Sequence, residues 1–233
     1  MLLTQLLRKQ GQKVGLLSKP QETLDKGLPL GGRIGGLVHI EDTSFIVANS
    51  VGGLVNRVAE SASIVAICSY ALGGNKTYRY LLDTDPLSYI QVTQQDGKVE
   101  EVLYFVQVHR LQPTSIEVFD NLLGEGGLGS AQFNSPMTNP PTAYVRCMGG
   151  EDDEYVEPFE CTQKCIFDPL GETGFRAAVN LSYYSRLLSD GTPEFMCISM
   201  IEPLDVGPGM EGIDTAFVYD LGFPISRNSI TII

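Results

Sequence analysis

Two carboxylates placed two residues apart, Asp83 and Asp85, are the first residues whose spacing could support chemistry. Residues i and i+2 of a β-strand share a face, so such a pair could serve as general acid and general base. Pro86 follows directly, however, and the sequence Asp-Thr-Asp-Pro is typical of a turn whose carboxylates accept hydrogen bonds from backbone N–H groups. We therefore expect a turn here, and an acid–base pair is the alternative.

Cys161 and Cys165, separated by three residues, could bind a metal ion through their thiolates. A structural zinc site usually needs four ligands, and neither His39, His109 nor the other thiols add a second pair at a familiar spacing. Pairing of Cys68 with either histidine for nucleophilic catalysis stays open, although no spacing favours it. Five cysteines at scattered positions do not resemble a disulfide framework, so the sequence predicts reduced thiols and no metal site.

Three further patterns fail to match the sites they suggest. The acidic run at 151–154 lacks the alternating oxygen ligands and the glycine of a calcium loop, so we expect a solvated surface loop. The glycine pairs of 31–36 lack the lysine of a phosphate loop and instead favour a close backbone crossing. The serine motif G-x-S-x-G does not occur in the sequence. The sequence therefore predicts no cofactor and favours a protein without enzymatic activity.

The composition limits the classes of partner. The formal net charge of −12 repels phosphate backbones and anionic lipid surfaces, so we expect no nucleic-acid partner. Membrane contact is left to residues 1–12 alone, where Arg8 and Lys9 could meet lipid headgroups. An apolar fraction of 43% with 19% charged residues is typical of a globular chain. With reduced thiols, these features predict a cytoplasmic protein, or one assembled into a particle made in the cytoplasm.

The clearest structural signal lies in residues 63–110. Asp96-Gly97 separates two β-prone runs, and this dipeptide is the strongest short-range signal for a hairpin with a type I′ turn. In the second arm, one parity of residues is more uniformly apolar than the other, and we expect it to face the core. That set is Val102, Tyr104, Val106 and Val108.

Short β-strands are predicted along most of the chain. They are expected near 37–40, 45–47, 64–68, 77–82, 89–93, 99–108, 144–147, 174–184, 195–201, 214–219 and 229–233. A helix is expected over 113–123, capped by Thr114 or Ser115 and ended by Gly124, followed by a long loop over 124–141. Residues 1–12 are expected to form a helix with one apolar face, made of Leu2, Leu3, Leu6 and Leu7.

These elements predict a β-rich α+β fold. We expect a mostly antiparallel sheet, or a partly open barrel or sandwich, with one or two short helices. The predicted organisation is an N-terminal helix and linker over 1–27 and a single β-rich domain over 28–233.

Three segments resemble one known family. They are 28–36 (LPLGGRIGG) with the apolar strand after it, 78–85 (YRYLLDTD), and the closing segment that ends in 229–233 (SITII). Together they resemble the YjfK-like family, bacterial proteins of unknown function. The resemblance spans 28–233 except for 110–175, and it implies an accessory role near membranes in envelope stress. It transfers no catalytic residue, and neither the 124–141 loop nor Cys161 and Cys165 belong to the pattern.

The sequence favours a non-enzymatic binding or assembly protein, one form of which is a structural component of a virion or another large assembly. We expect a protein partner or self-association. One alternative is an accessory factor in bacterial envelope or membrane stress. Another is a small-molecule-binding or hydrolytic β-barrel, in which Asp83, Asp85, Arg33, Arg79 and Tyr78 would line one cleft. The candidate interaction residues are Leu2, Leu3, Leu6, Leu7, Arg33, Arg79, Asp83 and Asp85.

Overall fold

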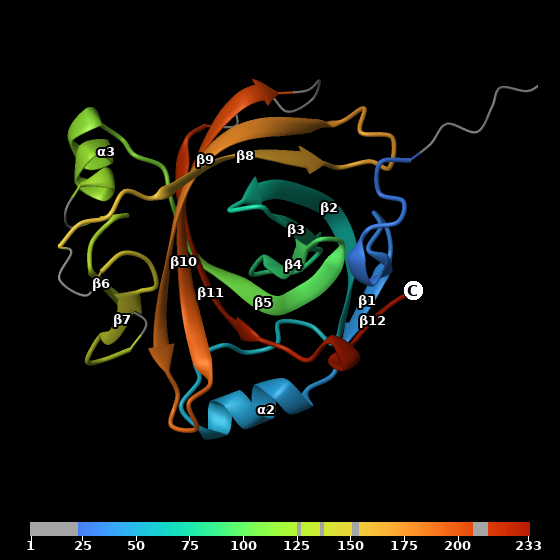
Figure 1. Ribbon diagram of the computed structural model, residues 1–233, viewed down its shortest axis with the longest axis horizontal. Helices are drawn as coiled ribbons and strands as arrows, with labels where there is room; N and C mark the ends of the chain where they lie inside the picture. The colour runs from blue at the N-terminus through green and yellow to red at the C-terminus, as the bar shows by residue number, and fades with distance from the viewer. Residues whose placement is uncertain (1–22, 125–126, 136–137, 151–153, 207–213) are drawn as a thin grey trace, which may run out of the picture.

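The computed structural model, which describes residues 23–124, 127–135, 138–150, 154–206 and 214–233, contains a closed antiparallel barrel of eight strands (Figure 1). β8 pairs with β9 on one side and with β2 on the other, and this closes the ring. Around the barrel the strands are β2 (Ser61–Leu72), β3 (Asn75–Leu82), β4 (Ser88–Gln95), β5 (Lys98–Leu111), β11 (Ala216–Pro224), β10 (Pro193–Val206), β9 (Gly174–Leu187) and β8 (Phe159–Ile166). The predicted β-rich antiparallel fold is confirmed, and its form is a closed barrel.

Tight turns connect two pairs of neighbouring strands, one of them at the predicted Asp96-Gly97 position. The β4–β5 turn is Asp96-Gly97, with φ of 51° and 76°, as a type I′ turn requires. The β2–β3 turn is Gly73-Gly74, again with two positive φ angles, of 57° and 85°. Both central positions of such turns need a left-handed backbone, which glycine adopts without a steric cost.

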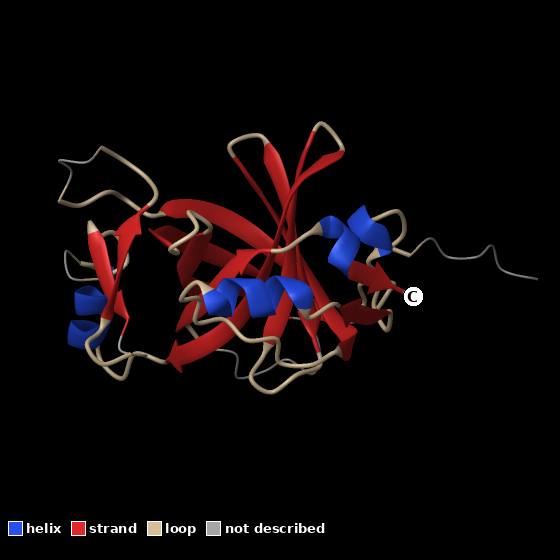
Figure 2. Ribbon diagram, turned by 90° about the horizontal axis from the view of Figure 1, so that it is seen from below, coloured by secondary structure: helices blue, strands red, loops and turns tan. Residues whose placement is uncertain are grey.

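Further elements cover the outside of the barrel (Figures 1 and 2). Strands β1 and β12 extend the sheet beyond β2, and β7 and β6 extend it beyond β9. The outer elements are η1 (Pro29–Gly31), β1 (Leu37–Ile40), α2 (Thr43–Ser50), α3 (Ile116–Leu123), β6 (Gln132–Ser135), β7 (Thr142–Arg146), η2 (Arg227–Ser229) and β12 (Ile230–Ile232). Strand β12, which pairs with β1, confirms the strand predicted near 229–233.

The outer face of the barrel carries the largest apolar core. Val102, Tyr104 and Val106 of β5 belong to it, as their parity predicts. Phe45 of α2 packs edge-on against Tyr104, with ring centroids 5.0 Å apart. Phe119 of α3 packs in the same way on Phe217 of β11, at 5.8 Å. Most of the fold's apolar burial therefore lies between the barrel wall and the elements that cover it.

The inner face of the barrel is buried as well. The prediction that one parity of β5 residues faces the core therefore describes only one of two packed faces. Leu103 and Phe105, of the opposite parity on β5, point into the barrel and are 3% and 0% exposed. Gly222 of β11 lies opposite Phe105, and a Cβ built on it would lie 2.4 Å from the Phe105 ring. Glycine is therefore required at this position to admit the phenylalanine.

The predicted close backbone crossing occurs at Gly35 and Gly36: the Gly35 N–H donates to the carbonyl oxygen of Ile64 on β2 at 2.8 Å, and the Ile64 N–H donates to the carbonyl oxygen of Gly36 at 2.9 Å. At Gly32 the close contact is with a side chain. A Cβ on this residue would lie 2.4 Å from the Tyr80 ring, so no larger residue fits without a shift. The Tyr80 hydroxyl donates to the carbonyl oxygen of Pro29 at 2.7 Å. The glycine-rich segment thus lies flat against the outer face of β3.

The prediction that all thiols are reduced is wrong for two cysteines. Cys68 on β2 and Cys165 on β8 are joined by a disulfide, although 97 residues separate them in sequence. They are direct partners in the register of the two strands, which pair over only three residue pairs. The disulfide therefore fastens the seam at which the barrel closes. Sequence spacing gave no sign of it because only the fold brings these residues together.

The local predictions have three corrections. Residues 45–47 lie in α2 and not in a strand, because Phe45 turns inward onto the barrel as part of a helix. Strand β8 was not predicted, and the expected loop 124–141 contains β6. Helix α3 is confirmed: the Ser115 hydroxyl accepts from the backbone N–H of Val118 at 3.2 Å, and Gly124 follows the last turn.

The predicted helix over 1–12 and its leucine face lie outside the described residues. Of the predicted N-terminal segment 1–27, the structure describes residues 23–27, and these are hydrogen-bonded to the β-rich domain. The Leu24 N–H donates to the carbonyl oxygen of Pro169 at 2.7 Å, and the Asp25 carboxylate accepts from the Ile34 N–H at 3.0 Å. No helix in the described part of the chain combines the length and the apolar character needed to cross a lipid bilayer.

Candidate functional site

A buried arginine lies at the centre of the barrel. Arg79 of β3 is 4% exposed, and its guanidinium lies over the rings of Tyr70 and Tyr89, at 5.3 and 5.1 Å from their centroids. Arginine stays protonated in proteins, so this side chain places a permanent positive charge inside the barrel. The ion pairs found among the described residues do not include Arg79. A buried charge without a close counter-charge is costly, which makes this residue a functional candidate.

Neutral polar groups surround the Arg79 guanidinium on one side. Its Nε donates to Gln91 Oε1 at 3.0 Å, and its Nη2 lies 3.4 Å from the Tyr183 hydroxyl and 3.5 Å from the Tyr70 hydroxyl. The Tyr183 hydroxyl also donates to Gln91 Oε1, at 3.1 Å. Burial raises the pKa of Tyr183 well above its usual value, so the hydroxyl stays protonated. This layer holds Arg79 in place with dipoles and supplies no compensating charge.

A carboxylate faces the same interior from β11, three strands along the barrel from β3. Asp220 of β11 is 2% exposed, and its Oδ2 accepts from the Tyr89 hydroxyl at 2.8 Å. Burial raises the pKa of Asp220 from 3.8 to about 6, although the Arg79 charge and the Tyr89 hydrogen bond both act to lower it. Asp220 and Arg79 are therefore opposite charges within one interior, farther apart than a direct ion pair.

A cavity of about 290 Å³ opens from this interior toward the β3–β4 turn, and we call it the Asp220 cavity. Arg79, Asp220 and Gln163 all line it. Asp220 Oδ1 and Gln163 Oε1 are buried oxygens that accept no hydrogen bond within the described residues. Gln163 Nε2 donates to the Cys165 sulfur at 3.1 Å, and a disulfide sulfur can only accept, which supports this orientation of the amide. Both residues line the cavity, and each has one buried oxygen without a donor.

The other end of the barrel holds a second cavity of about 360 Å³. Tyr70, Gln91 and Tyr183 line it, so the polar layer around Arg79 separates the two ends. The buried Oδ1 of Asn75 in its wall also has no partner within the described residues. The barrel therefore has a cavity at each end, with the buried Arg79 and Asp220 at the Asp220 cavity and the exposed Glu101 at the second cavity.

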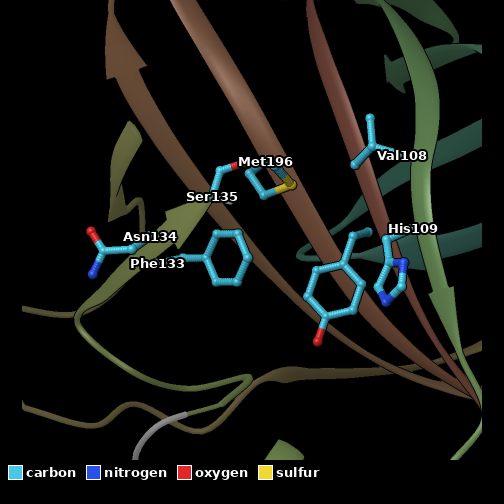
Figure 3. A pocket seen from close by; sticks show the side chains of 7 residues that line it. Val108, His109, Phe133, Asn134, Ser135 and Met196 are labelled. Atoms are coloured by element: carbon cyan, nitrogen blue, oxygen red, sulfur yellow. The ribbon is translucent and has the colours of Figure 1, made fainter. Parts of the chain in front are cut away.

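A third cavity, of about 510 Å³, lies outside the barrel between β5, β11, β10 and the strand β6 (Figure 3). Phe133 and Tyr219 form its aromatic wall, with ring centroids 5.7 Å apart. A β-bulge beside Tyr219 shifts the register of β5, and both Val108 and His109 line the cavity as a result. The described residues that line this outer cavity include no buried charge, so it carries weaker evidence for a specific ligand than the barrel interior does.

The sequence-derived candidates do not form one cleft. Arg79 points into the barrel, whereas Tyr78 belongs to the apolar core on the outer face. Asp83 and Asp85 are exposed in the turn between β3 and β4, as the proline predicts, and Arg33 is exposed beside η1. The predicted cleft of these five residues is therefore wrong, because neighbours along a strand point to opposite faces.

The cysteine pair of the C-x3-C motif cannot act together on a metal ion, since Cys165 is held in the disulfide. Within the described ranges, no group of three or more histidine, cysteine, aspartate or glutamate side chains is placed to hold a metal. His39 lies beside Ser61 on the surface, and Cys68 is not a free thiol. A Cys68–histidine pair is thereby ruled out while the disulfide is intact.

A second buried carboxylate, Glu194, has a structural role. Its Oε1 accepts from Tyr144 at 2.8 Å and from Arg186 Nη2 at 2.7 Å, and its Oε2 accepts from the Leu54 N–H at 2.6 Å. Glu194 is 1% exposed, and both of its oxygens have partners. It fixes β7 and the segment after α2 to the barrel wall.

No protein-family model, curated protein or solved structure matches this chain. The resemblance to the YjfK-like family therefore stays a prediction, and the case for a function rests on the geometry of the barrel.

Proposed function

We propose that this chain is a non-enzymatic binding protein whose ligand is a small polar molecule held inside the barrel. The observation that carries the proposal is the Asp220 cavity, where two buried oxygens have no hydrogen-bond donor and the buried Arg79 has no counter-charge in direct contact among the described residues. Leaving one buried polar atom without a hydrogen bond costs about 1–3 kcal/mol, so several such atoms at one site need an explanation. A bound ligand with complementary polar groups would form the missing hydrogen bonds.

Binding is favoured over the hydrolytic alternative by the protonation states of the interior groups. Burial raises the pKa of the Cys197 thiol and of the Tyr89 hydroxyl, so both stay in their neutral, unreactive forms. The positive charge of Arg79 does not reverse this for Cys197. The interior is thus equipped to recognise polar groups rather than to attack them.

The test uses one substitution that fills the cavity and one that does not. Ile201 lines the Asp220 cavity, whereas Ile116 is 80% exposed on the outside. We would screen the protein by saturation-transfer NMR against amino acids, aliphatic amines and aliphatic carboxylates. We expect a binder of the unmodified chain to bind Ile116→Trp equally and to be lost in Ile201→Trp, with both variants folded by circular dichroism. Equal binding to Ile201→Trp would show that the barrel is not the site.

Assembly is the second candidate, and one observation favours it. Val145 of β7 and Leu187 of β9 are 62% and 71% exposed, and they are diagonal neighbours on one sheet face because Val145 pairs with Ser185. We propose that this face takes part in self-association. The mass in solution, measured by light scattering, should fall when Leu187 is changed to arginine; a monomer in both cases removes this candidate.

The compartment is also a proposal. The predicted cytoplasmic location rests on reduced thiols, whereas the Cys68–Cys165 disulfide persists best where conditions are oxidising. The disulfide therefore weighs toward a protein that works outside a reducing cytoplasm. Thiol labelling of the protein as isolated from its native cells, with alkylation before lysis, would decide between the two.

A further inference from the structure

The Asp220 cavity contains groups of both charge signs, and this limits what it can hold. Asp220 Oδ1 and Gln163 Oε1 are acceptors without donors. Arg79 is a donor: its Nε and Nη2 have partners, but its Nη1 donates to no atom of the described residues. A ligand that satisfies this cavity must therefore carry N–H donors toward Asp220 and acceptors toward Arg79.

The charges that line the cavity further limit which ligands can bind. Arg79 and Asp220 are the buried charges among the described lining residues and are not in direct contact, and the exposed Arg110 and Asp214 add one further cation and one further carboxylate. The described lining therefore has no net charge. A ligand with a single charge would compensate one of the two buried charges and leave the other buried and unpaired, which is costly. A zwitterion compensates both at once and keeps the interior neutral.

The size and walls of the cavity fit a small molecule with an apolar part. Its volume of about 290 Å³ corresponds to about ten water-sized volumes. Besides the polar groups, Leu81, Phe175, Ile201 and Val218 line it. An apolar substituent would pack on these side chains while the charged groups lie toward the interior.

We propose that the Asp220 cavity binds a small zwitterion of the α-amino-acid type. Its ammonium group donates to Asp220 Oδ1 and Gln163 Oε1, and its carboxylate accepts from Arg79 Nη1. This assignment rests on the proposed function, because it names the ligand class for the same barrel site. It accounts for all three unpartnered groups with one molecule.

The test compares ligands that differ by one charged group. Each common L-amino acid is titrated into the full chain by calorimetry, and the tightest binder is compared with its decarboxylated and deaminated analogues. For leucine these are 3-methylbutylamine and 4-methylpentanoate, which keep the same apolar part. We expect the amino acid to bind at least about tenfold more tightly than either analogue, since each analogue leaves one buried charge unpaired. Equal binding of either analogue, or no binding of any amino acid, would overturn the zwitterion assignment.

Two matched variants locate the ammonium group. Asp220→Asn removes the cavity carboxylate, and Asp83→Asn makes the same change in an exposed turn. We expect Asp220→Asn to weaken amino-acid binding about tenfold or more without weakening the deaminated analogue, and Asp83→Asn to change neither. Unchanged amino-acid binding in Asp220→Asn would refute the ammonium position. If a ligand of another class binds and Ile201→Trp removes it, the barrel function stands and only the ligand class fails.

Discussion

The substitution Asp220→Asn gives a prediction that needs no ligand. The Asp220 carboxylate is buried between β strands of the barrel, and burial raises its pKa to about 6 from an ordinary value of 3.8. Its nearest titratable neighbours are Arg79 on β3, Tyr89 on β4 and Cys197 on β10, and the exposed Arg110 and Asp214 line the same cavity. Asparagine keeps an oxygen that can accept from the Tyr89 hydroxyl, but it has no charge to desolvate. The substitution therefore isolates the cost of the buried charge.

The sign and size of the effect follow from linkage. The folded chain holds the Asp220 proton more tightly than the unfolded chain, so this group favours the folded state below pH 3.8, and that contribution is lost as pH rises through about 6. The gap between 3.8 and about 6 corresponds to about 3 kcal/mol, at about 1.4 kcal/mol for each pH unit. We expect Asp220→Asn to be more stable than the unmodified chain by up to about this amount at neutral pH.

The assay is urea unfolding of both proteins at several pH values between about 4 and 8, with the difference in unfolding free energy taken at each pH. Groups that titrate equally in the two proteins cancel in this difference. We expect it to be near zero at the acid end and to grow as pH rises toward 7. Asp83→Asn, an exposed change of the same charge, is the control and should show no such growth. A difference that does not change with pH, or a variant less stable at neutral pH, would refute the account of Asp220.

Two further predictions concern stability. Replacing Cys68 and Cys165 by serine opens a loop of 97 residues, and chain-entropy reasoning gives a loss of about 4 to 5 kcal/mol; urea unfolding with and without reductant measures it, and reductant should not affect the double variant. Glu194→Ala should cost about 3–5 kcal/mol, because it leaves Arg186 and the Leu54 N–H without their acceptor, and Glu194→Gln should cost less. A thermal melt that leaves Glu194→Ala within about 1 kcal/mol of the unmodified chain would contradict the structural role of this carboxylate.

Local signals in the sequence were sufficient for the hairpins and for α3. The Asp96-Gly97 turn and the Ser115 cap act within a few residues, so neither depends on the rest of the fold. Strand β8 could not be recognised because its inward residues include Gln163 and two cysteines, which break the apolar alternation of a strand. Residues 45–47 have a β-prone composition, and only packing on the barrel makes them helical.

The sequence predicts the candidate site less well than it predicts the fold. The sequence draws attention to Arg79, but its partners Gln91 and Tyr183 and the carboxylate of Asp220 lie on three other strands, and only barrel closure brings them together. One signal was present: Arg79, Gln91 and Asp220 are polar residues inside runs that are otherwise apolar and β-prone. Polar residues at the buried parity of several strands indicate a polar interior, and the order of the strands around the barrel is still needed to place them.

The arrangement of polar and apolar faces explains how this fold can tolerate a charged interior. Small barrels usually fill their interior with apolar side chains, which then form the core. Here the main apolar core lies outside the wall, where α2, α3 and η1 cover the strands, and the interior contributes only two smaller apolar clusters. Stability therefore does not depend on a fully apolar interior. Arg79 and Asp220 can remain buried and not directly paired at a cost that the outer core offsets, and a ligand that pairs with both would recover part of that cost as binding affinity.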